Sequence, residues 1–198
     1  METAEIHKSF AEIVSNSLAI DQASVQPEAT LEKLGAASLD VVEISMEAES
    51  RFNVWLPDKS ILDTAIEMVG RPQMLDGDRL TEFGKAMFRA RLPQEQWSLL
   101  DGEVTSGDLR SYFMRVDTWV RMIADLREQT PKACTACGGR ELADRPGFTL
   151  VCESCGEEMK LRPGQEINRE WIEGFIAKSG SNGANQDVDV ARSVSAAG

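Results

Sequence analysis

Four cysteines set the strongest constraint on how this chain folds. They form two copies of a Cys-x-x-Cys-Gly motif, at residues 134–138 and 152–156, with fourteen residues between Cys137 and Cys152. Two residues between cysteines let both thiolates of a turn face one ion, and four thiolates complete the closed tetrahedral shell that Zn²⁺ favours in structural sites. The sequence therefore predicts a small β-hairpin over residues 132–160 with one structural zinc ion. Its predicted ligands are Cys134, Cys137, Cys152 and Cys155.

Three other uses of these cysteines stay open. Structural disulfides are rare in a reducing cytosol, and a redox-active pair is disfavoured because neither motif opens a helix after a strand. Iron in a rubredoxin-like ribbon would use the same four ligands. Because so small a ribbon has little core, we expect metal chelation to unfold residues 132–160, whereas a disulfide form would respond to reductant.

The composition and net charge of the chain disfavour some classes of binding partner. The 198 residues carry a formal net charge of −12, and like charge opposes approach to nucleic acid and to anionic lipid. The sequence has no apolar run of membrane-spanning length, and its N-terminus lacks the basic and apolar blocks of a signal peptide. We therefore expect a cytoplasmic protein that binds basic protein surfaces, without nucleic-acid binding or membrane insertion.

Apolar spacing in the N-terminal part predicts two helices. The first is an amphipathic helix over residues 3–18. The second begins with Ser38 as its N-cap, since a serine oxygen can accept an otherwise unpaired backbone N–H, and runs to Phe52. On it Ile44, Ala48 and Phe52 share one face, and acidic residues line another.

Further helices are expected after Pro57. A short helix over residues 62–69 ends at Gly70, and another starts near Asp78. A capping segment at residues 105–108 precedes one helix of about five to six turns that ends near Leu126. Apolar residues at 167, 171 and 175 predict a last short helix that docks the ribbon onto the bundle.

The loop before the second helix and the exit after it carry a family resemblance. The residues concerned are Leu34-Gly35-Ala36-Ala37-Ser38-Leu39-Asp40-Val41-Val42-Glu43-Ile44 and Phe52-Asn53-Val54-Trp55-Leu56-Pro57-Asp58. This segment resembles the acyl carrier protein family, closely over about residues 10–57 and loosely over 105–126. The resemblance implies that Ser38 carries a 4′-phosphopantetheine arm and is not a catalytic nucleophile, although an isolated serine at this position would be interpreted as a helix cap.

The resemblance implies a carrier that works with partner enzymes and is not an enzyme itself. It also implies a monomer, because such a carrier must visit several enzymes. A phosphopantetheinyl transferase would attach the arm from coenzyme A to the Ser38 oxygen, and the thiol of the arm would hold an acyl group as a thioester. A long arm raises the effective concentration of that thioester at successive enzymes. Residues of the second helix would meet basic patches on acyl-loading, condensing or acyl-transfer enzymes. These are Asp40, Val42, Glu43, Met46 and Glu47.

Two features depart from the family pattern. Ala37 stands where the pattern has aspartate, so modification could be slower or need a dedicated transferase. The residues from about 60 to 104 have no counterpart in a compact carrier domain.

We therefore predict a mainly α fold. An acyl-carrier-like helical domain occupies residues 1–130 with a helical insertion at about 60–104, followed by a β-hairpin zinc ribbon at 132–160 and a C-terminal helix at 161–178. Residues 179–198 are rich in Gly, Ser, Ala and Asn and are expected to be disordered.

The expected function is that of an acyl carrier in a specialised fatty acyl or polyketide-like pathway, with a ribbon that is structural or selects partners. Two other functions stay open. One is a zinc-ribbon adaptor for protein interactions whose carrier-like helices are unmodified, and the other is an aminoacyl or peptidyl carrier.

Overall fold

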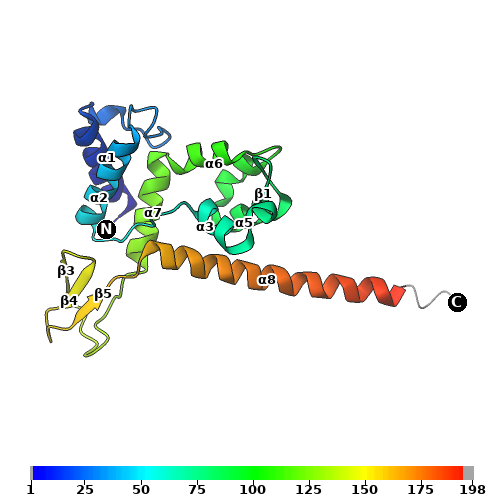
Figure 1. Ribbon diagram of the computed structural model, residues 1–198. Helices are drawn as coiled ribbons and strands as arrows, with labels where there is room; N and C mark the ends of the chain where they lie inside the picture. The colour runs from blue at the N-terminus through cyan, green and yellow to red at the C-terminus, as the bar shows by residue number, and fades with distance from the viewer. Residues whose placement is uncertain (1, 194–198) are drawn as a thin grey trace. The chain divides into compact units, whose positions relative to one another are not determined.

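The computed structural model describes the backbone of residues 2–193 and the side chains of residues 2–179. The chain forms two compact units, one built from residues 2–58 and 105–165, the other from 59–104 and 166–193. Most elements are helices, and three strands, β3 to β5, form a small antiparallel sheet (Figure 1). The predicted fold class, mainly α with a small β-ribbon, is confirmed.

The first unit contains four α-helices. They are α1 (Thr3–Leu18), α2 (Ser38–Phe52), α6 (Ser106–Phe113) and α7 (Val116–Glu128), with a 3₁₀ turn at Gln22–Ser24. Helix α1 packs against both α2 and α7, because each presents an apolar stripe at helical spacing. At the centre Phe10 is fully buried and its ring stacks on Trp119, with the ring centroids 5.5 Å apart.

The prediction of one helix from Leu109 to Leu126, after a capping segment at residues 105–108, is wrong, because the chain breaks between α6 and α7. The N–H of Leu31 donates to the carbonyl of Met114, and the N–H of Val116 donates to the carbonyl of Ala29, both at 2.9 Å. Arg115 has an extended backbone and forms a β-bridge with Thr30. The helix therefore gives way to a short backbone pairing with the loop that follows α1.

The ribbon belongs to the first unit. Strands β3 (Leu142–Arg145), β4 (Thr149–Cys152) and β5 (Glu158–Lys160) pair antiparallel in that order. Leu142 pairs with Cys152 and Arg145 with Thr149, so β3 and β4 form the hairpin that the cysteine spacing predicts.

The second unit is built from short elements and helix α8 from Glu166 onward. These are α3 (Ile61–Val69), α4 (Arg71–Met74), β1 (Leu75–Asp76), β2 (Arg79–Leu80), α5 (Glu82–Arg91), the 3₁₀ helix η2 (Gln94–Leu100) and α8 (Gly164–Ser193). Helix α3 agrees with the prediction for residues 62–69. The expected helix start near Asp78 is wrong, because β1 and β2 form a two-stranded hairpin there and α5 begins only after Thr81, whose hydroxyl accepts from the N–H of Gly84.

Helix α8 differs from the C-terminal helix predicted for residues 161–178. Two of its aromatic side chains contact α5: the Phe175 ring meets the Phe83 ring edge-on, and Arg91 lies over the Trp171 ring. Docking of the ribbon by this helix stays a prediction. The helix continues to Ser193, where composition predicts a disordered tail, and residues 194–198 of that tail lie outside the described residues. Within the described part of the chain, no helix is long and apolar enough to cross a membrane.

The packing of the first unit leads to a test. Replacing Phe10 by alanine removes a fully buried ring from the contact between α1 and α7, which we expect to lower the free energy of unfolding by about 3–5 kcal/mol. Urea unfolding followed by circular dichroism measures this. Leu39→Ala is the control, because the Leu39 side chain is 70% exposed and its loss is expected to change stability by less than about 0.5 kcal/mol. Equal effects of both variants would contradict the assignment of this core.

Candidate functional site

Ser38 opens helix α2 with an exposed side chain. The loop before it is held by its own backbone, since the N–H of Leu34 donates to the carbonyl of Thr30 and the N–H of Ala36 donates to the carbonyl of Leu31. Leu31 itself is fully buried. The loop therefore presents the Ser38 hydroxyl at the surface from a fixed backbone.

Ser38 is not the N-cap of α2, contrary to the prediction. The cap is Ala37, which has no side-chain oxygen to accept from the first turn. The Asp40 carboxylate accepts instead from the backbone N–H of Ala37 at 2.7 Å. The amides of the first turn thus lack a capping side chain, and they form the positive end of the helix dipole beside the Ser38 hydroxyl.

The outer face of α2 is acidic and apolar at once. Leu39, Val42 and Met46 are among the large apolar side chains that stay exposed, while Ile44, Ala48 and Phe52 are buried on the opposite face. The acids of this face form no ion pair with any residue whose side chain is described; they are Asp40, Glu43 and Glu47. The five residues predicted to dock partners therefore lie on one accessible helix, with Asp40 half-buried and the other four exposed.

The four cysteine sulfurs converge on one point. Each pair of sulfurs lies within 4.8 Å, and the Cys134–Cys155 and Cys137–Cys152 Sγ distances are both 3.6 Å. A disulfide bond would be far shorter, about 2.05 Å. Tetrahedral zinc with Zn–S bonds of about 2.3 Å puts its sulfurs roughly 3.8 Å apart. The spacing suits four thiolates around one ion better than two disulfides.

Both Cys-x-x-Cys-Gly motifs have the same backbone turn. The N–H of Gly138 donates to the carbonyl of Cys134, and the N–H of Gly156 donates to the carbonyl of Cys152. The two glycines have φ of 73° and 77°, a left-handed conformation that glycine adopts without steric cost. This is why a glycine follows each Cys-x-x-Cys pair.

The thiols shift one another's pKa in opposite directions. Burial raises the pKa of Cys152, but hydrogen bonds from the N–H groups of Cys155 and Ser154 and from the Cys137 thiol outweigh it and lower the pKa to about 7. For Cys155, the hydrogen bond from the N–H of Glu157 lowers the pKa, but the neighbouring sulfurs, Cys137 foremost, and burial raise it to about 12. The Cys152 thiol therefore loses its proton readily, and the sulfurs around Cys155 disfavour a second thiolate there. A bound cation relieves this repulsion, so the cluster could hold a metal ion.

A side-chain junction joins the ribbon to the end of α2. The Asn53 amide donates to the Asp144 carboxylate at 2.8 Å and to the carbonyl of Thr149 at 3.1 Å. Arg127 of α7 donates to the carbonyl of Phe52 and to Asp144, both at 3.2 Å. Sequence reasoning missed this junction. The only local signal is Asn53 itself, a residue suited to the left-handed position after a helix.

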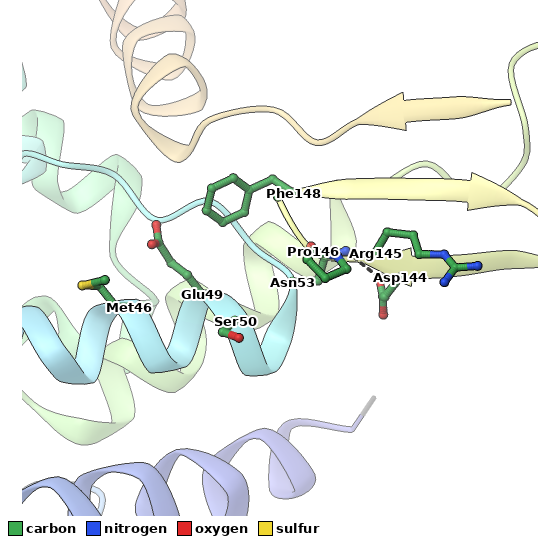
Figure 2. Close-up of a pocket in the computed structure, with 9 residues that line it drawn as sticks. Met46, Glu49, Ser50, Asn53, Asp144, Arg145, Pro146 and Phe148 are labelled. Carbon is green, nitrogen blue, oxygen red and sulfur yellow. Dashed lines mark hydrogen bonds between the residues drawn. The ribbon is translucent and has the colours of Figure 1, made fainter.

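The ribbon and α2 enclose a pocket beside this junction (Figure 2). Met46, Glu49 and Ser50 line it from α2, and the tip of the β3–β4 hairpin lines it from the other side. Burial raises the pKa of Glu49, partly offset by the hydrogen bond that its carboxylate accepts from the N–H of Leu56. No sequence pattern pointed to this pocket, because its two walls are about a hundred residues apart in the chain.

Known proteins resemble this chain in sequence over a limited stretch. An acyl carrier protein of Syntrophobacter fumaroxidans is 40% identical over 60 residues, which are 30% of this chain and 74% of that protein. One of Rubrobacter xylanophilus is 42% identical over 60 residues, again 74% of its length. One of Helicobacter pylori is 48% identical over 48 residues, 62% of its length.

The chain belongs to the acyl carrier protein family. No family model and no solved structure matches it. These relatives match 24–30% of the chain, so most of this acyl carrier protein family member lies outside the part that it shares with them.

The uncapped start of α2 leads to a second prediction. Ala37→Asp would give the first-turn amides a side-chain acceptor, and we expect it to raise the free energy of unfolding by about 1 kcal/mol. Urea unfolding measures the change. Ala36→Asp adds the same charge one residue earlier, outside capping position, and is expected to give less than half of the gain. Equal gains would mean that only the added charge matters.

Proposed function

We propose that this protein carries an acyl group as a thioester on a 4′-phosphopantetheine arm attached to Ser38. The observation that carries the proposal is the exposed Ser38 hydroxyl at the head of α2 in a chain of the acyl carrier protein family. The uncapped amides of the first turn suit the phosphodiester, because free N–H groups at a helix N-terminus bind anions. When attached, the arm supplies a mobile thiol that forms the thioester.

The chain's own residues would present the attachment site and orient the carrier on its partner enzymes. Ser38 would offer its oxygen to a phosphopantetheinyl transferase, which uses coenzyme A as donor. The acids of α2 would then attract basic patches on acyl-handling enzymes, and Val42 and Met46 would fill apolar sockets there. Since no acid of this face has an ion-pair partner among the described side chains, binding such a patch breaks no internal salt bridge.

Attachment is tested by intact mass after incubation with coenzyme A and a transferase. We expect a mass gain of one phosphopantetheine group in the natural chain and in Ser45→Ala, and no gain in Ser38→Ala. Ser45 is the control because it is a half-buried serine of the same helix whose hydroxyl donates to the carbonyl of Val41. The absence of a gain with several transferases would favour the adaptor function over the carrier function.

We further propose that the cysteine cluster holds one structural Zn²⁺ through Cys134, Cys137, Cys152 and Cys155. Four soft thiolates in a closed set are the ligands of structural zinc, and nothing in such a set leaves a position open for catalysis. The metal would keep the ribbon folded. The hairpin would then hold its place against α2, where it can select partners or contribute to a binding site.

Metal removal tests this role. Because so little core backs the ribbon, we expect chelation to release one zinc ion per chain and to expose the amides of residues 132–160 to hydrogen exchange, while α1, α2 and α7 stay protected. Metal analysis and hydrogen exchange by mass spectrometry measure both effects. Reductant alone is the control and is expected to change neither, whereas unfolding by reductant would indicate disulfides.

A further inference from the structure

The pocket between α2 and the ribbon has the size of a ligand site. Its volume is about 350 Å³, within the range of small-molecule pockets. One wall is the C-terminal half of α2, and the other is the turn between β3 and β4, which ends in Gly147 and Phe148. Figure 2 shows the Phe148 ring extending over α2 on the side that carries Met46 and Glu49.

The hairpin wall is held in place by several contacts. The Phe148 ring stacks on Trp55, with centroids 4.8 Å apart and planes 15° from parallel. The backbone of Phe148 has a φ of 57°, which is costly for a bulky residue and persists only where its surroundings enforce it. Asp144 at the base of the turn is tied to Asn53 and Arg127. These contacts fix the hairpin wall of the pocket against the end of α2.

The lining is mixed in polarity. Met46 and Phe148 give apolar surface, and Ser50 and Arg145 give hydrogen-bond donors. Two carboxylates, those of Glu49 and Asp144, add acceptors that suit the amide N–H groups of a phosphopantetheine arm. Arg145 is exposed and has no ion-pair partner among the described side chains. Such a lining suits a chain in which alkyl segments alternate with amide and thioester carbonyls, and suits a wholly apolar tail less well.

The pocket lies within reach of Ser38 along a single helix face. Glu49 follows Ser38 by eleven residues, which places it about 16 Å along the axis and roughly 20° around it. Val42 and Met46 lie between them, both exposed. An arm of about fifteen bonds from the serine Cβ to the sulfur extends roughly 17 Å, since three backbone bonds span about 3.5 Å. The thiol can therefore arrive between Met46 and Glu49.

We propose that this pocket binds the distal end of the chain's own phosphopantetheine arm, together with the thioester and the first carbons of its acyl group. Val42 and Met46 line the path of the arm, Phe148 covers its alkyl part, and Arg145 donates to a carbonyl oxygen. The inference rests on the proposed attachment at Ser38. It gives the ribbon a direct part in holding the cargo, because one wall of the site is the ribbon turn.

The test compares the reactivity of the arm thiol in variants of the modified chain. Ser50→Trp fills the pocket from an exposed position of α2, and Arg145→Ala removes the proposed donor. Arg140→Ala removes an exposed arginine of the same ribbon that does not line the pocket. Alkylation is followed by mass spectrometry on the peptide that contains Ser38, which separates the arm thiol from the four cysteines.

We expect the arm thiol to react about fivefold faster in Ser50→Trp than in the natural chain, as for an arm docked about four-fifths of the time. Arg145→Ala should react about twofold faster, and Arg140→Ala at the natural rate. Attachment of the arm should also shift the amide resonances of Gly147 and Phe148, with no such shift when Ser38→Ala is treated in the same way.

The outcomes separate this inference from the proposed function. A mass gain at Ser38 with equal alkylation rates in all variants and unmoved Gly147 and Phe148 resonances overturns the pocket and leaves the carrier function intact. The absence of any mass gain with several transferases overturns both. Faster alkylation in Ser50→Trp but not in Arg140→Ala, with the shifts of both resonances, supports the pocket.

Discussion

The backbone pairing between the loop after α1 and the start of α7 is the constraint on which the rest of the first unit depends. Thr30 bridges Arg115, and the Leu31 and Val116 amides donate across the pairing. This pairing separates α6 from α7, and it buries Leu31 at the base of the loop that leads to Ser38. It also sets where α7 begins, and α7 in turn carries Trp119 to the core and Arg127 to the ribbon. A few backbone hydrogen bonds thus determine both the presentation of Ser38 and the place where the ribbon is held.

Helix α2 serves two purposes along its length. Its first turns carry apolar side chains that are exposed and acids that form no ion pair among the described side chains, which is a surface suited to transient binding of basic partners. Its last turn is joined to the ribbon through Asn53, Arg127 and the Asp144 carboxylate. Since Asp144 accepts from both partners, it links helix, ribbon and α7 at one point. The proposed arm would attach at the first turn of the helix, and its distal end would bind beside the C-terminal half of the same helix.

Sequence reasoning succeeded where the signal was local. The helices at Thr3–Leu18, Ser38–Phe52 and Ile61–Val69 follow from apolar spacing and end signals within each segment. It failed at Met114–Arg115, where the apolar spacing continues but the backbone of Arg115 pairs with that of Thr30. It also failed at residues 75–80, where a hairpin replaces the start of a helix. The cap of α2 was misplaced by one residue, because Ser38 is a favourable cap by type while the geometry gives that position to Ala37.

By itself the sequence determined the four cysteines that could share an ion, the serine at the head of an acidic helix and the mainly helical fold, because these depend on spacing within a few turns of chain. Only the tertiary structure decided that the ribbon contacts the end of α2 and that a pocket lies between them. Asn53 and Asp144 are 91 residues apart, and hydrogen bonds over such a separation leave no trace in local periodicity. They form only because packing of α1, α2 and α7 brings the ribbon to that helix end.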